Sequence, residues 1–269
     1  IMNRVASSKK ANAVAEVMTT IFDIPGYNYA SSRYEKDAKN HPDQATTGSE
    51  TLTQTLYDNW QLVKKLPTMT GDFMWTGYDY LGEAGIGTVQ YKNRKTKQSV
   101  DPGLIISGGS GIIDICGKLR PEVGWGKIIW GLQSTPTLGV DPLTYTEYFQ
   151  SLSMWRNTDA VESWSWEGCE GRCTTATVYS DAAQVELLLN GKSLGKKRPK
   201  KDIVKFKKVP YEAGKLEAVA YDASGKETGR AALTSASGKT CIQLTPETTT
   251  LHANGQDLCF LNIDLTGTD

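Results

Sequence analysis

The sequence has no uninterrupted apolar run of the ~18 residues that a membrane-spanning helix requires. Its 30 basic and 30 acidic residues give a formal net charge of zero, and no block of like charge dominates. The densest basic run, residues 192–208, includes Asp202 and is typical of a solvated hairpin. These absences exclude a membrane span and argue against a surface for nucleic acids or anionic membranes. We expect no signal peptide at residues 1–5, whose pattern is typical of the interior of a longer sequence.

Residues that bind transition metals are also scarce, because the chain has two histidines and five cysteines. Cys169 and Cys173 form the one close cysteine pair, and no second pair lies at the spacing of a zinc site. We therefore expect no metal centre of this kind. In a secreted protein the two cysteines would close a small disulfide loop; two free thiols are the alternative, and the sequence leaves both open.

Helical and strand patterns alternate through the first 83 residues. In chain order we predict a helix at 3–22, a strand at 23–29, a helix with a solvated charged face at 31–41, a strand at 45–47, a helix at 53–66 that Pro67 ends, and a strand at 72–75.

The strand before Glu50 and the strand that ends at Trp75 are separated by one helix, which predicts a βαβ unit with parallel strands. In parallel α/β folds the chemistry lies at the carboxyl ends of the strands. Glu50 and Trp75 are each predicted to lie where a strand gives way to a loop. An indole can pack on a pyranose ring while a carboxylate meets the anomeric carbon, so this pairing indicates a glycosidase site.

Two motifs extend this interpretation. The runs Pro42-Asp43 and Gly48-Ser49-Glu50-Thr51, followed by Gly71-Asp72-Phe73-Met74-Trp75-Thr76-Gly77-Tyr78-Asp79-Tyr80-Leu81-Gly82-Glu83, resemble the nucleophile strand and last barrel strand of family 2 glycoside hydrolases, the β-galactosidase and β-glucuronidase family. The second run matches at nearly every position. Residues 112–117 resemble the final barrel segment. The resemblance implies that residues 1–135 form the C-terminal portion of a (β/α)8 TIM barrel.

The resemblance also implies roles for individual residues. Glu50 would be the nucleophile and Tyr29 would orient it, although a tyrosine that only caps the barrel edge is the alternative. Asp79 would contact the substrate or hold its own loop through backbone amides. The residues implied for substrate binding are Trp75, Asp79, Glu83 and Asn28.

Long irregular segments follow the Trp75 strand. The Gly-rich stretch 82–111 is predicted to be a loop that closes over the sugar site, because loops of this length are usually functional or mobile. Trp125, Trp130 and Trp155 lie in an aromatic-rich segment, for which we favour a domain interface over ligand binding.

From about residue 160 the pattern changes to short alternating strands, beginning with 160–166, with turn residues between them. Asn190-Gly191 predicts a hairpin. The spacing predicts a β-sandwich, and residues 136–233 resemble the immunoglobulin-like module that follows the barrel in many family 2 enzymes. Residues 234–269 are predicted to begin a further, truncated sandwich.

A retaining glycosidase needs a second carboxyl group as acid/base, which in the resembled family is a Glu after an Asn. This sequence contains no Asn-Glu pair. We therefore expect a fragment whose partner is the missing N-terminal part, carried in the same parent chain or as a second chain, and we expect the isolated chain to be inactive.

The predicted function is that of a retaining exo-glycosidase that acts on terminal β-galactosides. The alternatives are an inactive carbohydrate-binding or scaffold fragment, or a β-glucuronidase or β-mannosidase relative. No cofactor is predicted; Mg²⁺ or Na⁺ enters only through the resemblance, without an assignable ligand set. The location stays open, with an extracellular or periplasmic bacterial enzyme favoured, and the sugar specificity is not predicted.

Overall fold

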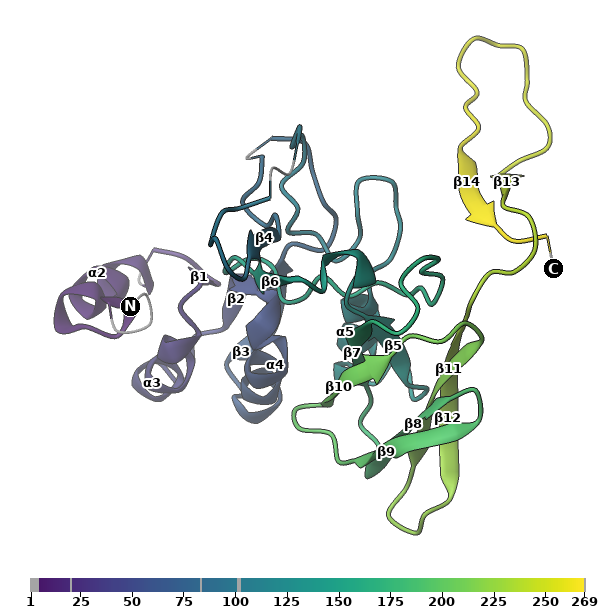
Figure 1. Ribbon diagram of the computed structural model, residues 1–269. Helices are drawn as coiled ribbons and strands as arrows, with labels where there is room; N and C mark the ends of the chain where they lie inside the picture. The colour runs from purple at the N-terminus through teal and green to yellow at the C-terminus, as the bar shows by residue number, and fades with distance from the viewer. Residues whose placement is uncertain (1–4, 20, 83, 101–102, 269) are drawn as a thin grey trace.

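The computed structural model describes residues 5–19, 21–82, 84–100 and 103–268. The first region contains a parallel sheet in the order β1-β2-β3, built from β1 (Gly26–Asn28), β2 (Thr46–Leu52) and β3 (Met69–Trp75). Helices α2 (Lys9–Thr19), α3 (Tyr34–Asn40) and α4 (Leu56–Lys65) accompany these strands (Figure 1). The predicted βαβ unit is confirmed, because α4 connects the parallel strands β2 and β3.

The helix ends follow local chemistry. The Ser8 hydroxyl accepts a hydrogen bond from the backbone N–H of Ala11 at 3.2 Å, so α2 begins after a capping serine and is shorter than the predicted helix 3–22. Helix α4 follows a 3-10 turn at Thr53–Thr55, and Leu66 is extended because Pro67 comes next. The short turn Ser31–Arg33 leads into α3 in the same way.

The charged face predicted for residues 31–41 is wrong at one position. Asp37 is 3% exposed, and its carboxylate accepts hydrogen bonds from the Arg33 guanidinium and, at 2.8 Å, from the Tyr27 hydroxyl. Arg33 lies four residues earlier on the same helical face, which brings the two charges together. The pair is part of the contact between α3 and β1.

A second, half-buried polar group lies between the sheet and the helices. The Asp72 carboxylate accepts hydrogen bonds from the hydroxyls of Tyr34 at 3.0 Å and Thr51 at 2.8 Å, and from the amide of Asn59 at 3.3 Å. Burial raises the pKa of Asp72, and the three donors act in the opposite direction. This network joins α3, α4, β2 and β3.

Gly48 leaves room for that network. A Cβ atom at Gly48 would lie 2.2 Å from the Tyr34 hydroxyl oxygen and 2.3 Å from Asp72 Oδ1. These distances are shorter than any real van der Waals contact. The glycine before Glu50 is therefore explained by packing on the helical side of the sheet.

The segment predicted as a long loop, 82–111, is partly wrong, because it contains β4 (Gln90–Asn93), which pairs antiparallel with β6 (Tyr148–Ser151). Ile113 forms a single parallel bridge with Tyr78, so the segment resembling the final barrel strand continues the sheet by one residue pair. Helix α5 (Pro121–Ile129) follows, and the short helix Leu143–Tyr145 precedes β6.

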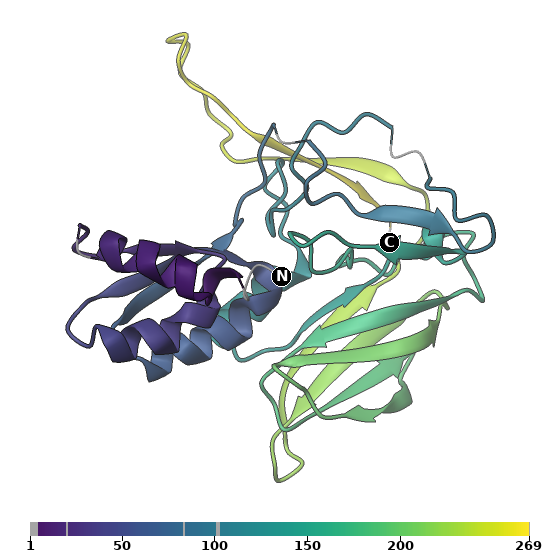
Figure 2. The same cartoon turned by 90° about the vertical axis from the view of Figure 1, so that its left-hand side faces the viewer.

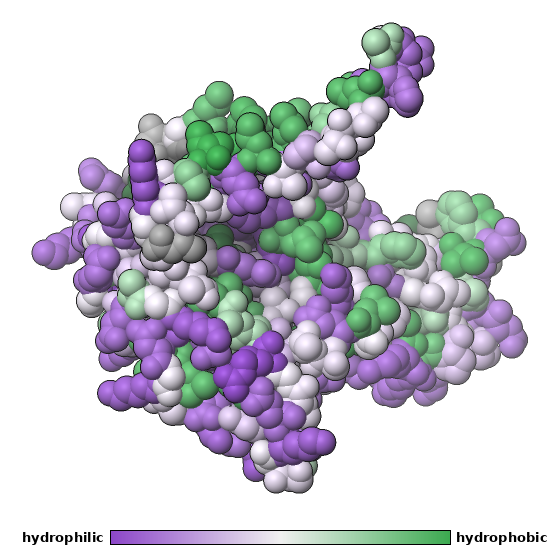
Figure 3. All heavy atoms as spheres, turned by 90° about the vertical axis from the view of Figure 1, so that its right-hand side faces the viewer, coloured by the Kyte–Doolittle hydropathy of each residue, from purple (hydrophilic) through white to green (hydrophobic). Residues whose placement is uncertain are grey.

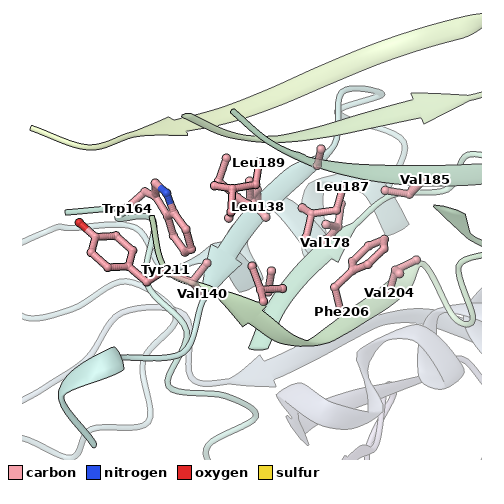
Figure 4. Packing of buried hydrophobic residues seen from close by; sticks show 14 of the residues in the cluster. Leu138, Val140, Trp164, Val178, Val185, Leu187, Leu189, Val204, Phe206 and Tyr211 are labelled. Carbon is pink, nitrogen blue, oxygen red and sulfur yellow. The ribbon is translucent and has the colours of Figure 1, made fainter. Parts of the chain in front are cut away.

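Two antiparallel sheets pack face to face in the next region. One sheet has the order β10-β7-β5 and the other has the order β12-β11-β8-β9. The strands are β5 (Thr137–Val140), β7 (Cys173–Tyr179), β8 (Gln184–Leu189), β9 (Lys192–Lys197), β10 (Ile203–Pro210), β11 (Lys215–Tyr221) and β12 (Glu227–Thr234). Figure 4 shows the shared core, in which Val178 and Phe206 of one sheet meet Leu187 and Leu189 of the other.

The Asn190-Gly191 hairpin between β8 and β9 is confirmed, and both residues have positive φ as a tight hairpin turn requires. The strand predicted at 160–166 is wrong, because its pairing is limited to one bridge between Val161 and Val140. Trp164 in that segment is instead buried in the core, and its indole donates to the Glu212 carbonyl.

The interface expected for the tryptophans holds for Trp125. Its ring packs 6.0 Å from Tyr179 of β7, and its indole donates to the Lys201 carbonyl at 3.1 Å, which joins α5 to the sandwich. Trp130 packs on Trp60 of α4 within the first region, which corrects its predicted role at a domain interface.

The last described strands, β13 (Cys241–Pro246) and β14 (Leu261–Thr266), form an antiparallel hairpin that projects from the sandwich (Figures 1 and 2). Apolar side chains in this part of the chain are exposed, among them Ile242, Phe260 and Ile263. Figure 3 shows hydrophobic (green) patches on the surface of the molecule. The described residues contain no closed barrel. None of the helices in the described ranges has the length and apolar character needed to cross a membrane.

Candidate active site

The carboxyl ends of β1, β2 and β3 lie on the same edge of the parallel sheet, and they carry the residues predicted for catalysis. Asn28 is the register partner of Glu50, and Leu52 is the partner of Trp75. Glu50 lies two residues before the end of β2, inside the strand and not after it as predicted. Its backbone is paired with Asn28 of β1, whereas the register with β3 shifts between Gly48 and Thr51.

Asn28 holds the Glu50 carboxylate from the neighbouring strand. Its side-chain amide donates to Glu50 Oε2 at 2.9 Å. The Ser49 hydroxyl donates to the Asn28 side-chain oxygen, also at 2.9 Å, which leaves the NH2 group turned toward the carboxylate. The amide orientation is thus set by the residue that precedes Glu50.

Tyr29 contacts Glu50 twice. Its backbone N–H donates to the Glu50 carbonyl at 2.7 Å, and its hydroxyl is hydrogen-bonded to the Glu50 carboxylate. The residue adopts a positive φ of 53°, which turns the chain at the end of β1. Burial and the bond to Glu50 raise the pKa of Tyr29 above its usual value. The hydroxyl therefore stays protonated and donates to the carboxylate.

Trp155 completes this group, and sequence reasoning missed it. Its indole N–H donates to the Tyr29 hydroxyl at 2.9 Å, with the rings at 90° and 6.2 Å between centroids. The sequence analysis places Trp155 at a domain interface. Nothing in the local pattern shows that residues 29 and 155 meet. We call Asn28, Tyr29, Ser49, Glu50 and Trp155 the Glu50 cluster.

Trp75 is the last residue of β3 and is half-buried. Its ring packs edge-on against Tyr80 at 5.6 Å between centroids. The peptide bond between Trp75 and Thr76 is cis. The tryptophan therefore lies at the same edge of the sheet as Glu50, with its ring fixed by an aromatic neighbour from the following loop.

Asp79 has the environment of a loop anchor. Its side chain is 7% exposed, and its carboxylate accepts from the backbone N–H of Gly109 at 2.9 and 3.1 Å and of Gly111 at 3.4 Å. Arg156 donates to the Gly109 carbonyl at 2.8 Å from the other side. Of the two roles left open by the sequence, these contacts favour the structural one. Glu83 lies outside the described residues.

No group of three or more His, Cys, Asp or Glu in the described ranges is arranged to hold a metal ion. Cys169 and Cys173 are free, the first buried and the second exposed. The Glu50 cluster itself presents an oriented carboxylate with an amide donor and a phenol donor. Such a carboxylate can attack an electrophilic carbon or stabilise a developing positive charge.

We compared the chain with known protein families and with curated proteins, and both comparisons found similar sequences. The family described as a domain of unknown function (DUF4982) matches residues 171–229, within the sandwich. The chain is 26% identical over 77% of its length to a β-galactosidase of Bacteroides ovatus, BoGH2A, and 29% identical over 66% of its length to a provisionally named β-glucuronidase of Formosa agariphila. It spans 20% and 14% of the lengths of these two curated relatives.

A solved structure agrees over more of the chain. A glycosyl hydrolase family 2 member from Bacteroides cellulosilyticus superposes with a TM-score of 0.76 and is 33% identical. The match covers 91% of this chain and 32% of that protein.

Proposed function

Since this chain belongs with the family 2 glycoside hydrolases, we propose that it contributes the nucleophile side of a retaining exo-β-galactosidase. The observation that supports this proposal most directly is the Glu50 carboxylate, which receives the Asn28 amide at 2.9 Å and the Tyr29 hydroxyl. Two donors hold the carboxylate in one orientation, as a positioned nucleophile requires.

The proposed reaction has two displacements. A Glu50 oxygen attacks the anomeric carbon and forms an ester bond as the glycosidic C–O bond breaks, and the leaving oxygen takes a proton from a general acid. That acid, now a base, then removes a proton from water, which attacks the same carbon and releases Glu50. Because the sequence has no Asn-Glu pair, we assign the acid/base to a residue outside these 269 positions.

In this proposal Tyr29 orients the nucleophile through the bond that Trp155 supports from the other side. Trp75 forms the floor of the sugar subsite, and Asn28 contacts the substrate as well as Glu50. Asp79 acts by shaping the loop through Gly109. Glu83 keeps its predicted substrate role as a proposal.

The proposed architecture follows from the same resemblance. Residues 1–135 would be the C-terminal portion of a (β/α)8 barrel, residues 136–233 an immunoglobulin-like sandwich, and residues 234–269 the start of a further sandwich. The open strand edges of β1 and β3 would pair with the rest of the barrel. The partner of this chain is thus the remaining barrel segment.

The test is covalent labelling of Glu50 in the longest natural form of the protein that contains this sequence. A 2-deoxy-2-fluoro-β-galactoside should add one sugar to the peptide that carries Glu50, detected by mass spectrometry. The Glu50→Gln variant should take no label and lose turnover of a chromogenic β-galactoside. The Glu35→Gln variant is the matched control, since Glu35 is exposed and pairs with Lys65 on the surface.

The alternatives give different results. Turnover of a β-glucuronide but not a β-galactoside, with the same dependence on Glu50, would replace the proposed sugar and keep the mechanism. A protein that binds sugars without turnover or label would support the inactive carbohydrate-binding alternative and overturn the proposal.

A further inference from the structure

A cavity of about 320 Å³ lies where the β4–β6 ribbon meets the β10-β7-β5 sheet. It shares no lining residue with the Glu50 cluster, and Figures 1 and 2 both show the ribbon above the sandwich. Its volume is at the lower end of small-molecule sites, which span about 300–1,000 Å³. We call it the tyrosine cavity, after the residues of its aromatic wall.

That wall is built from three tyrosines. Tyr91 and Tyr145 stack with their centroids 4.1 Å apart at 24°, and Tyr148 meets Tyr145 edge-on at 6.3 Å. Tyr145 is 39% exposed, which leaves one of its surfaces open. An exposed aromatic face supported by a second ring is a platform on which the apolar face of a pyranose packs.

The platform is held in place before any ligand arrives. The Tyr91 hydroxyl donates to the Asp159 carboxylate and accepts from the Gln150 amide at 3.3 Å. The Asp159 carboxylate in turn accepts a hydrogen bond from the Arg156 guanidinium at 2.9 Å. Because these contacts fix the tyrosine, little side-chain entropy would be lost on binding.

A carboxylate also lines the cavity. Asp141 lines the cavity, and its backbone groups are both used by β7, since its N–H donates to the Thr175 carbonyl and its carbonyl accepts from the Thr174 hydroxyl. In the described part of the chain, no donor is hydrogen-bonded to the Asp141 carboxylate. Its oxygens are therefore available to the hydroxyl groups of a sugar.

A β-bulge brings two lysines to the same cavity. Consecutive side chains of a regular strand point to opposite faces, yet Lys207 and Lys208 of β10 both line this site. The register with β7 shifts between Phe206 and Val209, and Lys208 has a φ of 59°. A bulge of this kind redirects a side chain, and here it adds a second positive charge.

Arg94 contributes a third positive charge from the segment that follows β4. Three cations and one carboxylate leave the lining with a net charge of +2. A neutral sugar would need no such excess. The lining is instead complementary to a sugar that carries a carboxylate.

We propose that the tyrosine cavity is a non-catalytic binding site for a uronic-acid residue of an acidic glycan. The sugar ring packs on Tyr145, its hydroxyls donate to Asp141, and its carboxylate lies between Lys207, Lys208 and Arg94. This site goes beyond the proposed hydrolysis and does not depend on it. Its role would be to hold an acidic polysaccharide beside the enzyme.

Isothermal titration tests this proposal with a tetrasaccharide of glucuronic acid and its carboxyl-reduced counterpart. The protein carries Glu50→Gln, so that no turnover disturbs the measurement. We expect the acidic tetrasaccharide to bind at least about 10-fold more tightly than the reduced one and to weaken as salt increases. This result would hold even if Glu50 proved to have no catalytic role.

Three variants locate the site. Lys207→Gln/Lys208→Gln should weaken the acidic tetrasaccharide about 10-fold and leave the reduced one unchanged, whereas Tyr145→Ala should weaken both. Lys9→Gln/Lys10→Gln, a pair of exposed consecutive lysines on α2, is the control and should have no effect. Unchanged thermal unfolding shows that each variant is folded.

Equal affinity for the two tetrasaccharides would overturn the proposal, as would full retention of binding in Lys207→Gln/Lys208→Gln. Displacement of the tetrasaccharide by inorganic phosphate at equal concentration would show an anion patch without sugar recognition and would also overturn it.

Discussion

The side-chain amide nitrogen of Asn28 lies 2.9 Å from Glu50 Oε2, although 22 residues separate the two positions in the sequence. The contact follows from strand pairing, because Asn28 and Glu50 are register partners on adjacent parallel strands. The sheet itself therefore positions the amide group that donates to the proposed nucleophile, and no loop has to close for this hydrogen bond to form.

This contact predicts the effect of a charge at position 28. Asn28→Asp would place a second carboxylate beside Glu50, and like charges raise the pKa of the group that ionises second. In the complete enzyme, the acid limb of the kcat/KM profile should move up by about 1–2 pH units. Asn40→Asp, the same change at the exposed end of α3, should leave the profile in place. An unmoved acid limb in Asn28→Asp would show that Glu50 is not the titrating group.

Tyr29→Phe removes the hydroxyl between Glu50 and Trp155. We expect kcat to fall about 10²-fold, the order expected for one lost donor at a reacting group. Steady-state kinetics of the complete enzyme provide the measurement. Tyr57→Phe, on α4, is the control and should retain nearly full activity. If Tyr29→Phe were as active as the parent enzyme, the proposal that Tyr29 orients Glu50 would be wrong.

Gly48→Ala should destabilise the protein by about 1–3 kcal/mol, because the new methyl group would overlap the Tyr34 hydroxyl and the Asp72 carboxylate. Urea unfolding measures the loss. Gly71→Ala is the matched control on the neighbouring strand, where the nearest atom to a Cβ is 3.8 Å away. If both variants were equally stable, the packing explanation of Gly48 would be wrong.

Glu122 predicts a pH-dependent stability. It is 2% exposed at the start of α5, one carboxylate oxygen has no partner among the described residues, and burial raises its pKa from the ordinary 4.5 to about 7. The folded state therefore binds the Glu122 proton more tightly than the unfolded state does. The resulting contribution to the free energy of unfolding is fully present below pH 4.5 and is lost as the pH rises through about 7.

The loss amounts to about 3 kcal/mol for this shift. Glu122→Gln should remove this contribution, so that the stability of the variant falls less between pH 4.5 and 7.5 than that of the parent, and leave the variant more stable than the parent at neutral pH. Urea unfolding between pH 4.5 and 7.5 tests this, with Glu35→Gln as an exposed control. A parent chain whose stability is flat across that range would contradict the raised pKa.

The local part of the site could be predicted from the sequence. Glu50 and Trp75 come after short patterns of strand and helix, and the order of these patterns determines that the strands are parallel. Turn chemistry was equally informative at Asn190-Gly191, because few residue pairs adopt positive φ at both positions. These features depend on neighbours in the chain.

Long-range contacts were not predictable in this way. Asp37 looked solvated among charged neighbours, and only the fold brings Tyr27 to its carboxylate. Strand β4 lies in a Gly-rich segment and is defined by pairing with β6, about sixty positions later. Trp155 could not be assigned to the site either, because only the folded chain brings it to Tyr29, which lies 126 positions earlier in the sequence.

That pairing has a consequence for folding. The bond between Tyr29 and Trp155 joins residues 126 positions apart, whereas Asn28 and Glu50 are joined across 22. The entropy lost on closing a loop grows with its length, and contacts of long sequence separation form slowly. We therefore expect the Glu50 carboxylate to gain its amide donor before Trp155 supports the Tyr29 hydroxyl. On refolding, recovery of enzymatic activity should lag behind recovery of secondary structure.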